Sequence, residues 1–406
     1  MIRKAVSVCR QIIVITSITI VLIGLIEFGL RGIFTARGDS EPYKFHHKYI
    51  GQPNPGAVLE VKMSPINGGR PVVSTFNQWG FRGSNIDRDT DDIRIMVYGD
   101  SNIQAAFSDE EDSFAARLET ELESRSGRRF QVINAGVAGY GPDQVMLKIE
   151  DQIPLWKPDF VVVQLFADND FGDVVRNRLV SLDPDTDEIV VDGVPLTDTL
   201  VGYGLQLYIF KAIRSIWNKA MKATGLKRTR PDRVQLTELE RLKQRLKTEP
   251  EAYFDRSLPR VIGDHYDLDI ALDPGGEFSQ LKIRLVQKIL ARMYRFVRDH
   301  HRIPVVFLIQ PSVKDISTNA ELNFQELARM SKNYKRDNLT KPLVATFQRL
   351  DADYLNLFPV FVTDGLSPHY FRLDDPHWNE RGQELAASLM AGHILDRYEL
   401  PPVQGD

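Results

Sequence analysis

The feature that most constrains the fold is an alternation of apolar runs and amphipathic segments that begins near residue 93. The apolar runs predict strands, and the segments between them predict helices. Three consecutive valines follow Phe160, as expected of a strand that is buried on both faces. This alternation predicts a parallel sheet with crossover helices, in a three-layer α/β/α fold with about five strands. The expected strands cover residues 93–99, 129–136, 158–170, 304–311 and 351–358.

The sheet pattern is interrupted once and is preceded by two N-terminal regions. We expect a cytoplasmic tip and transmembrane anchor in residues 1–37 and a Gly-, Pro- and Asn-rich membrane-proximal extension in 38–90. The α/β domain is expected in 91–170 and 281–398, with an insertion of uncertain structure at 171–280.

The insertion contains an amphipathic, aromatic stretch from about Leu205 to Ala220. Its apolar face would be exposed unless it packed against the core, the membrane or an acyl chain. We expect it to form part of a substrate wall or lid, with Tyr208, Phe210 and Trp217 buried on one side. A purely structural appendage is the alternative.

The anchor is predicted from an apolar run between Ile12 and Leu30. About 20 helical residues span the hydrocarbon core of a bilayer. Three basic residues precede the run and two follow it, which favours a cytoplasmic N-terminus and a domain on the extracytoplasmic (periplasmic) side of the inner membrane. A cleaved signal peptide is the alternative, although the residues after the run offer a poor cleavage site.

Composition narrows the function classes. The net charge of −4 argues against a nucleic-acid partner. The single cysteine, Cys9, lies before or at the membrane edge, so the following domain has neither a disulfide nor a thiol nucleophile. No cofactor or metal is expected. A metal-dependent hydrolase using Asp168, Asp170 and Asp173 stays open as an alternative.

Clusters of small and polar residues stand where expected strands end. Ligands of parallel α/β sheets bind outside the carboxyl ends of the strands, so these clusters predict a site. They are Gly99-Asp100-Ser101, the glycine-rich segment 134–141, Asn169-Asp170, and the segment with Asp374, Asp375 and His377 that precedes the last helix.

This combination resembles the SGNH (GDSL-like) hydrolase superfamily, which is named after its Ser, Gly, Asn and His. Ser101, Gly139, Asn169 and His377 match those residues in order and spacing. The resemblance covers roughly residues 93–170 and 281–395. Two positions depart from the pattern, since Ala167 replaces a glycine and Asn102 replaces a common leucine, but neither change removes a catalytic atom.

The resemblance implies a catalytic triad. Ser101 would be the nucleophile, His377 its base, and Asp374 the orienting acid, with Asp375 as the alternative. In this family the oxyanion is bound by the Ser and Gly backbone N–H groups and the Asn side-chain amide. That implies Ser101, Gly139 and Asn169 as oxyanion donors.

The leading hypothesis is therefore a membrane-anchored serine esterase or O-acyltransferase. The resemblance implies acyl esters of cell-surface glycans as the substrate class. A lipase or thioesterase is the alternative within this class of enzyme. A non-catalytic, glycan-binding assembly component of the same fold is the alternative outside it.

Overall fold

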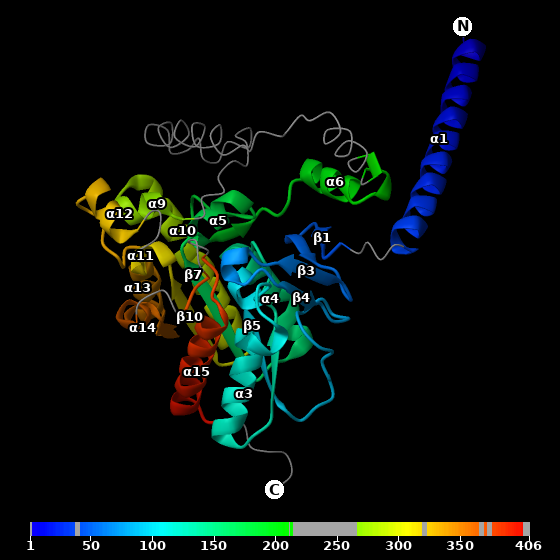
Figure 1. Ribbon diagram of the computed structural model, residues 1–406. Coiled ribbons are helices and arrows are strands. Elements are labelled where there is room, and N and C mark those ends of the chain that lie inside the picture. Colours follow the sequence, from blue (N-terminus) through cyan, green and yellow to red (C-terminus); the bar gives the residue numbers. More distant parts are fainter. Residues whose placement is uncertain are drawn as a thin grey trace.

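The computed structural model describes residues 2–36, 41–210, 212–213, 266–318, 323–364, 369–371 and 376–400. Its centre is one five-stranded sheet with the strand order β11-β10-β7-β5-β6 (Figure 1). The strands are β5 (Ile93–Tyr98), β6 (Phe130–Asn134), β7 (Phe160–Ala167), β10 (Val305–Pro311) and β11 (Asp353–Asn356). Every neighbouring pair is parallel. The predicted α/β class and the five parallel strands are confirmed.

The helices of the sheet domain cover both faces of the sheet. They are α3 (Phe114–Ser126), α4 (Pro142–Trp156), α10 (Glu277–Tyr294), α13 (Thr340–Leu350), α14 (Phe358–Asp364) and α15 (Glu380–Arg397). Residues of α4, α10 and α13 join one hydrophobic cluster against the sheet, and residues of α3, α14 and α15 join the other. All eight residues of the central strand β7 are buried, as its continuous apolar run predicts.

Local sequence signals set the helix ends. The Ser113 side chain accepts the Ala116 N–H and caps α3, and Gly127 ends this helix in the left-handed conformation at φ 68°. Pro142 is the first residue of α4, where its missing N–H costs nothing. Local sequence signals therefore determine where α3 and α4 begin and where α3 ends.

Residues 41–90 form two antiparallel hairpins against the sheet domain (Figure 1). Their strands are β1 (Tyr43–His46), β2 (Ile50–Pro53), β3 (Val58–Lys62) and β4 (Pro71–Thr75). The first hairpin is fixed to the sheet domain because Tyr140 Oη donates to the Gly51 carbonyl and Gln144 Nε2 donates to the Tyr49 carbonyl, both at 2.6 Å. This region also provides one wall of a surface pocket.

The remaining elements are short and follow the sheet strands. They are α2 (Ser101–Gln104), α5 (Asp170–Asn177), β8 (Val180–Leu182), β9 (Ile189–Val191), α6 (Leu196–Leu205), α9 (Leu268–Leu272), a π-helical turn (Arg295–His300), α11 (Val313–Ile316) and α12 (Phe324–Met330), with single 3-10 turns at Pro65–Asn67 and Glu110–Asp112. Within the predicted insertion, residue 211 and residues 214–265, including Trp217, lie outside the described residues.

Helix α1 (Ile2–Ala36) contains a stretch, Ile13–Ile33, that is long and apolar enough to cross a membrane by length and composition. A signal sequence would pass the same test. The helix projects away from the sheet domain in Figure 1. The Glu27 carboxylate accepts the Ile209 N–H at 3.1 Å, and the Arg31 guanidinium lies 5.2 Å from the Tyr208 ring centroid.

One expectation for the insertion is wrong. Phe210 is 46% exposed rather than buried with its neighbours. The physical reason is that the two residues before it, Tyr208 and Ile209, contact Arg31 and Glu27 of α1, and the Phe210 side chain remains exposed beside them.

Candidate active site

The turn after β5 brings Ser101 to the carboxyl edge of the sheet. Gly99 is favoured there, because a Cβ atom at this position would lie 2.4 Å from Gln164 Oε1 on the neighbouring strand and 2.5 Å from Ile103 Cγ1. The buried Asp100 carboxylate accepts the Asn102 N–H at 2.8 Å and caps α2. Ser101 is thus the first helical residue after a tightly constrained turn, which explains why a buried strand ends on Gly-Asp-Ser.

Ser101 and His377 lie together although 276 positions separate them in the chain. Ser101 Oγ is 2.9 Å from His377 Nε2, which is hydrogen-bond distance. The Phe107 ring lies against the imidazole, with 4.6 Å between ring centroids. Both members of the predicted nucleophile–base pair are half-buried, so a substrate can reach them.

Asn102 joins the two segments that carry this pair. Its Oδ1 accepts the Trp378 N–H at 3.1 Å, and its carbonyl accepts a hydrogen bond from Gln383 Nε2 at 3.0 Å. Asn102, which follows Ser101, therefore fixes the position of Trp378, which follows His377. Sequence reasoning noticed Asn102 only as a departure from a family pattern and missed this contact.

The two candidate acids, Asp374 and Asp375, lie outside the described residues. The structure therefore leaves the choice between them open. Asp100 is a buried carboxyl close to the site. Burial raises its pKa, while its backbone hydrogen bond to Asn102 and the attraction of His377 act in the opposite direction.

The glycine-rich loop after β6 lies beside the serine turn. The Val137 N–H donates to the Gly99 carbonyl at 3.1 Å, and the Ala138 N–H donates to Gln104 Oε1 at 2.6 Å. Gly139 follows in the left-handed region at φ 77° and is exposed. A residue with a side chain would be strained there, so glycine is required for this path of the loop.

Asn169 stands at the end of β7 and begins α5. Its Nδ2 donates to Asp173 Oδ2 at 3.1 Å, whereas its Oδ1 is buried and has no hydrogen-bond partner among the described residues. Arg176 forms an ion pair with Asp173 Oδ1 at 2.6 Å and also donates to the Gly139 carbonyl at 2.9 Å. Asp173 and Arg176 thus join the two predicted oxyanion residues, Asn169 and Gly139.

Asp173 is the buried member of this network. The Asp173 side chain is 4% exposed, and burial raises its pKa well above the usual range, with Arg176 acting in the opposite direction. Gly141 makes room for it, since a Cβ atom there would lie 2.8 Å from Asp173 Cβ. Sequence analysis missed Arg176 because nothing in its local pattern indicates that it reaches Gly139.

The three aspartates of the metal-hydrolase alternative have different partners. The Asp168 carboxylate accepts a hydrogen bond from Ser312 Oγ, Asp170 accepts the Phe166 N–H at 2.7 Å, and Asp173 pairs with Arg176. Within the described part of the chain, no three His, Cys, Asp or Glu side chains are grouped as metal ligands. These contacts favour a structural role for the three carboxylates.

Comparisons with known proteins add the following findings. No protein-family model and no curated protein matches this sequence. Among solved structures, the chain is similar to the esterase EstA from Pseudoalteromonas sp., with 12% identity, a TM-score of 0.35 and coverage of 75% of this chain and 98% of that one. It is similar to the SGNH-hydrolase family esterase AlinE4, with 13% identity, a TM-score of 0.34 and coverage of 78% and 100%. It is also similar to a GDSL-like lipase from Bacteroides thetaiotaomicron VPI-5482, with 9% identity, a TM-score of 0.35 and coverage of 77% and 93%.

The fold and the site agree with the motif order noted in the sequence. A parallel five-stranded sheet has a Ser–His pair at its carboxyl edge, in the motif order of SGNH hydrolases.

Proposed function

We propose that this chain is a serine ester hydrolase or O-acyltransferase. The observation that carries the proposal is the 2.9 Å distance between Ser101 Oγ and His377 Nε2. A serine hydroxyl is a weak nucleophile, and a histidine within hydrogen-bond reach is the base that activates it. Asp374 is proposed as the acid that fixes the imidazole tautomer, with Asp375 as the alternative.

The proposed reaction has two steps. Ser101 Oγ forms a bond to the ester carbonyl carbon while its proton passes to His377 Nε2. The tetrahedral intermediate then collapses, and the C–O bond of the ester breaks as the imidazolium gives its proton to the leaving alcohol. Water, or the hydroxyl of an acceptor, then gives a proton to the same nitrogen and attacks the carbonyl carbon of the acyl-serine. The bond between that carbon and Ser101 Oγ breaks, His377 Nε2 returns the proton to Oγ, and the acid or a new ester is released.

The oxyanion of each tetrahedral intermediate is proposed to accept hydrogen bonds from the Ser101 and Gly139 N–H groups and from Asn169 Nδ2. Losing one such donor typically raises the barrier by about 3–4 kcal/mol. Arg176 and Asp173 support this role because they hold the Gly139 carbonyl and the Asn169 amide. They are proposed as positioning residues that set the geometry of the donors.

The proposed location is the inner membrane, with the domain on the extracytoplasmic side. The exposed apolar surface of α1 supports a membrane-inserted N-terminal helix, and the poor cleavage site after it favours an uncleaved anchor. Large apolar side chains on α6 and after it are exposed as well: Leu196, Leu200, Val201, Phe210 and Ile213. The proposed substrates are acyl esters of cell-surface glycans. This apolar surface favours lipid esters or thioesters as the second candidate.

The test uses full-length protein in lipid nanodiscs with p-nitrophenyl acetate and longer p-nitrophenyl esters. We expect turnover that Ser101→Ala and His377→Ala each abolish, with little further loss in the double variant. Full activity in folded Ser101→Ala protein would contradict the serine mechanism. Acceptor sugars added to the same assay distinguish transfer from hydrolysis by the ester that forms.

A further inference from the structure

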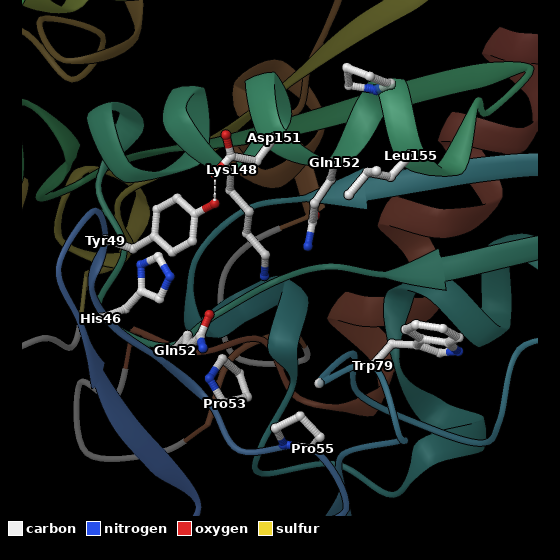
Figure 2. Close-up of a pocket in the computed structure, with 12 residues that line it drawn as sticks. His46, Tyr49, Gln52, Pro53, Pro55, Trp79, Lys148, Asp151, Gln152 and Leu155 are labelled. Atoms are coloured by element: carbon white, nitrogen blue, oxygen red, sulfur yellow. Dashed lines mark hydrogen bonds between the residues drawn. The ribbon is translucent and has the colours of Figure 1, made fainter. Parts of the chain in front are cut away.

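A pocket of about 500 Å³ lies away from Ser101 and His377, between the first hairpin and α4 (Figure 2). This volume is in the range of small-molecule sites. Its walls come from the hairpin, from the loop at Trp79 and from one face of α4. The proposed ester chemistry assigns no role to it.

Lys148 extends from α4 into this pocket (Figure 2). The residue is 6% exposed, and its Nζ donates to the Ala135 carbonyl at 3.0 Å. The rings of Phe81 and Tyr140 lie within 5.8 Å and 5.6 Å of Nζ. Within the described ranges, no carboxylate forms an ion pair with it. A buried cation without a counter-ion is costly, and burial lowers the pKa of Lys148 to about 7.

The other titratable groups around the pocket do not supply the missing negative charge. The Asp151 carboxylate is engaged by Lys48 Nζ and by Tyr49 Oη. His46 is stacked on Tyr49 with 4.3 Å between ring centroids, and burial lowers its pKa to about 4, so it is neutral near pH 7. Lys148 is therefore the one Lys or Arg among the residues that line the pocket, and no lining carboxylate pairs with it. The Arg88 guanidinium lies outside this lining, 5.3 Å from the Trp79 ring centroid.

The opposite wall is apolar. Trp79 is 44% exposed and stands edge-on against Trp156, with 5.5 Å between ring centroids. Pro53 and Pro55 add to the apolar lining on this side, and Leu155 adds to it from α4. The Gln152 side chain is directed into the same space in Figure 2, and its Oε1 has no hydrogen-bond partner among the described residues. A flat apolar body would fit this wall, with its polar end toward α4.

We propose that this pocket binds a monocarboxylate with a compact apolar body, whose carboxylate accepts hydrogen bonds from Lys148 Nζ and whose apolar part lies against Trp79. Gln152 supplies a second donor through its amide nitrogen. A monoanion suits the site because it faces a single ammonium group and the engaged Asp151 carboxylate lies nearby. The proposal is independent of the ester chemistry at Ser101.

Titration calorimetry of full-length protein in neutral-lipid nanodiscs tests this proposal by measuring the affinities of benzoate and of its uncharged analogue benzamide. Empty nanodiscs serve as the blank. A hydrogen bond from an ammonium to a carboxylate is charge-assisted, so we expect benzoate to bind about 10- to 100-fold more tightly than benzamide. Benzoate affinity should fall as the pH rises above 7, because Lys148 then loses its proton in the free protein. Buffers of different ionisation enthalpy should reveal proton uptake on binding.

Variants separate binding from a structural role. Lys148→Met should abolish the preference for benzoate, and Trp79→Ala should weaken benzoate and benzamide alike. Lys62→Met removes an exposed lysine on β3 and should change nothing. If Lys148→Met does not fold, an NMR titration of the Lys148 ammonium in the wild type serves instead, and benzoate should raise its pKa. Three outcomes would overturn the proposal: equal affinity for benzoate and benzamide, tighter binding of inorganic phosphate than of benzoate, or no binding of benzoate at about 10 mM.

Discussion

Arg176 donates to the Gly139 carbonyl at 2.9 Å and pairs with Asp173 at 2.6 Å, and Asp173 in turn accepts a hydrogen bond from Asn169 Nδ2. One arginine on α5 thus links two loops that follow different strands. Both loops carry a proposed oxyanion donor. The relative position of those donors therefore depends on a side chain outside the four family motifs.

Arg176→Met should lower kcat for ester hydrolysis about 10- to 100-fold, because a small displacement of a catalytic group is enough to cost this much. KM should change little. The affinity of a boronic acid inhibitor, which forms a tetrahedral adduct, should fall in parallel with kcat. Arg284→Met, which removes a surface ion pair with Asp187, is the matched control.

A purely structural Arg176 would give another result. The variant would then unfold at a lower temperature, while the folded fraction kept its kcat and its boronic acid affinity. The two measurements separate the roles because unfolding lowers the concentration of active sites but leaves kcat and inhibitor affinity per folded site unchanged.

The stability of the fold should decrease between about pH 4 and pH 7. Burial raises the pKa of Asp315 to about 7, although the hydroxyls of Tyr266 and Tyr334 donate to it at 2.7 Å and 2.8 Å. A carboxyl with a raised folded-state pKa binds its proton more tightly in the folded state, so folding loses free energy as the pH rises from about 4 to that pKa. Asp315 should cost the fold up to a few kcal/mol at pH 7, on the scale of about 1.4 kcal/mol per pKa unit.

Urea denaturation at pH 5 and pH 7 measures this effect. Asp315→Asn keeps an oxygen acceptor for both tyrosines but cannot titrate. The difference in unfolding free energy between wild type and variant should therefore change with pH in this window. A constant difference would mean that Asp315 does not titrate there.

The acid of the triad is settled by comparing Asp374→Asn with Asp375→Asn. We expect the first to lose several orders of magnitude in kcat, since an amide that stabilises the wrong imidazole tautomer costs about 10⁴-fold in a well-studied triad. The second should lose much less. The reverse ranking would assign the role to Asp375.

The sequence predicted the sheet well because each strand carries its own signal. The apolar run of β7 and the glycines that follow β5 and β6 have local physical causes: burial on both faces and close approach of the backbone. The Ser101–His377 contact could be predicted as well, because both residues stand in motifs at one edge of a parallel sheet.

The contacts that connect these motifs could not be predicted. Asn102 holds Trp378, and Arg176 reaches Gly139, across distances in sequence that no local pattern encodes. In the sequence, Lys148 is an ordinary polar residue of an amphipathic helix. Its surroundings in the structure include the first hairpin, which comes from residues far from α4 in the sequence. The exposure of Phe210 was missed for the same reason, because its segment contacts α1 rather than the sheet.

The central claim is that Ser101 is a nucleophile activated by His377. Its most direct test is covalent labelling of full-length protein with diethyl p-nitrophenyl phosphate, followed by intact mass measurement and peptide mapping. The account predicts one diethylphosphoryl group per chain, attached to Ser101, and slow or absent labelling in His377→Ala. A modified residue other than Ser101, or an unlabelled Ser101 in protein that hydrolyses esters, would contradict it.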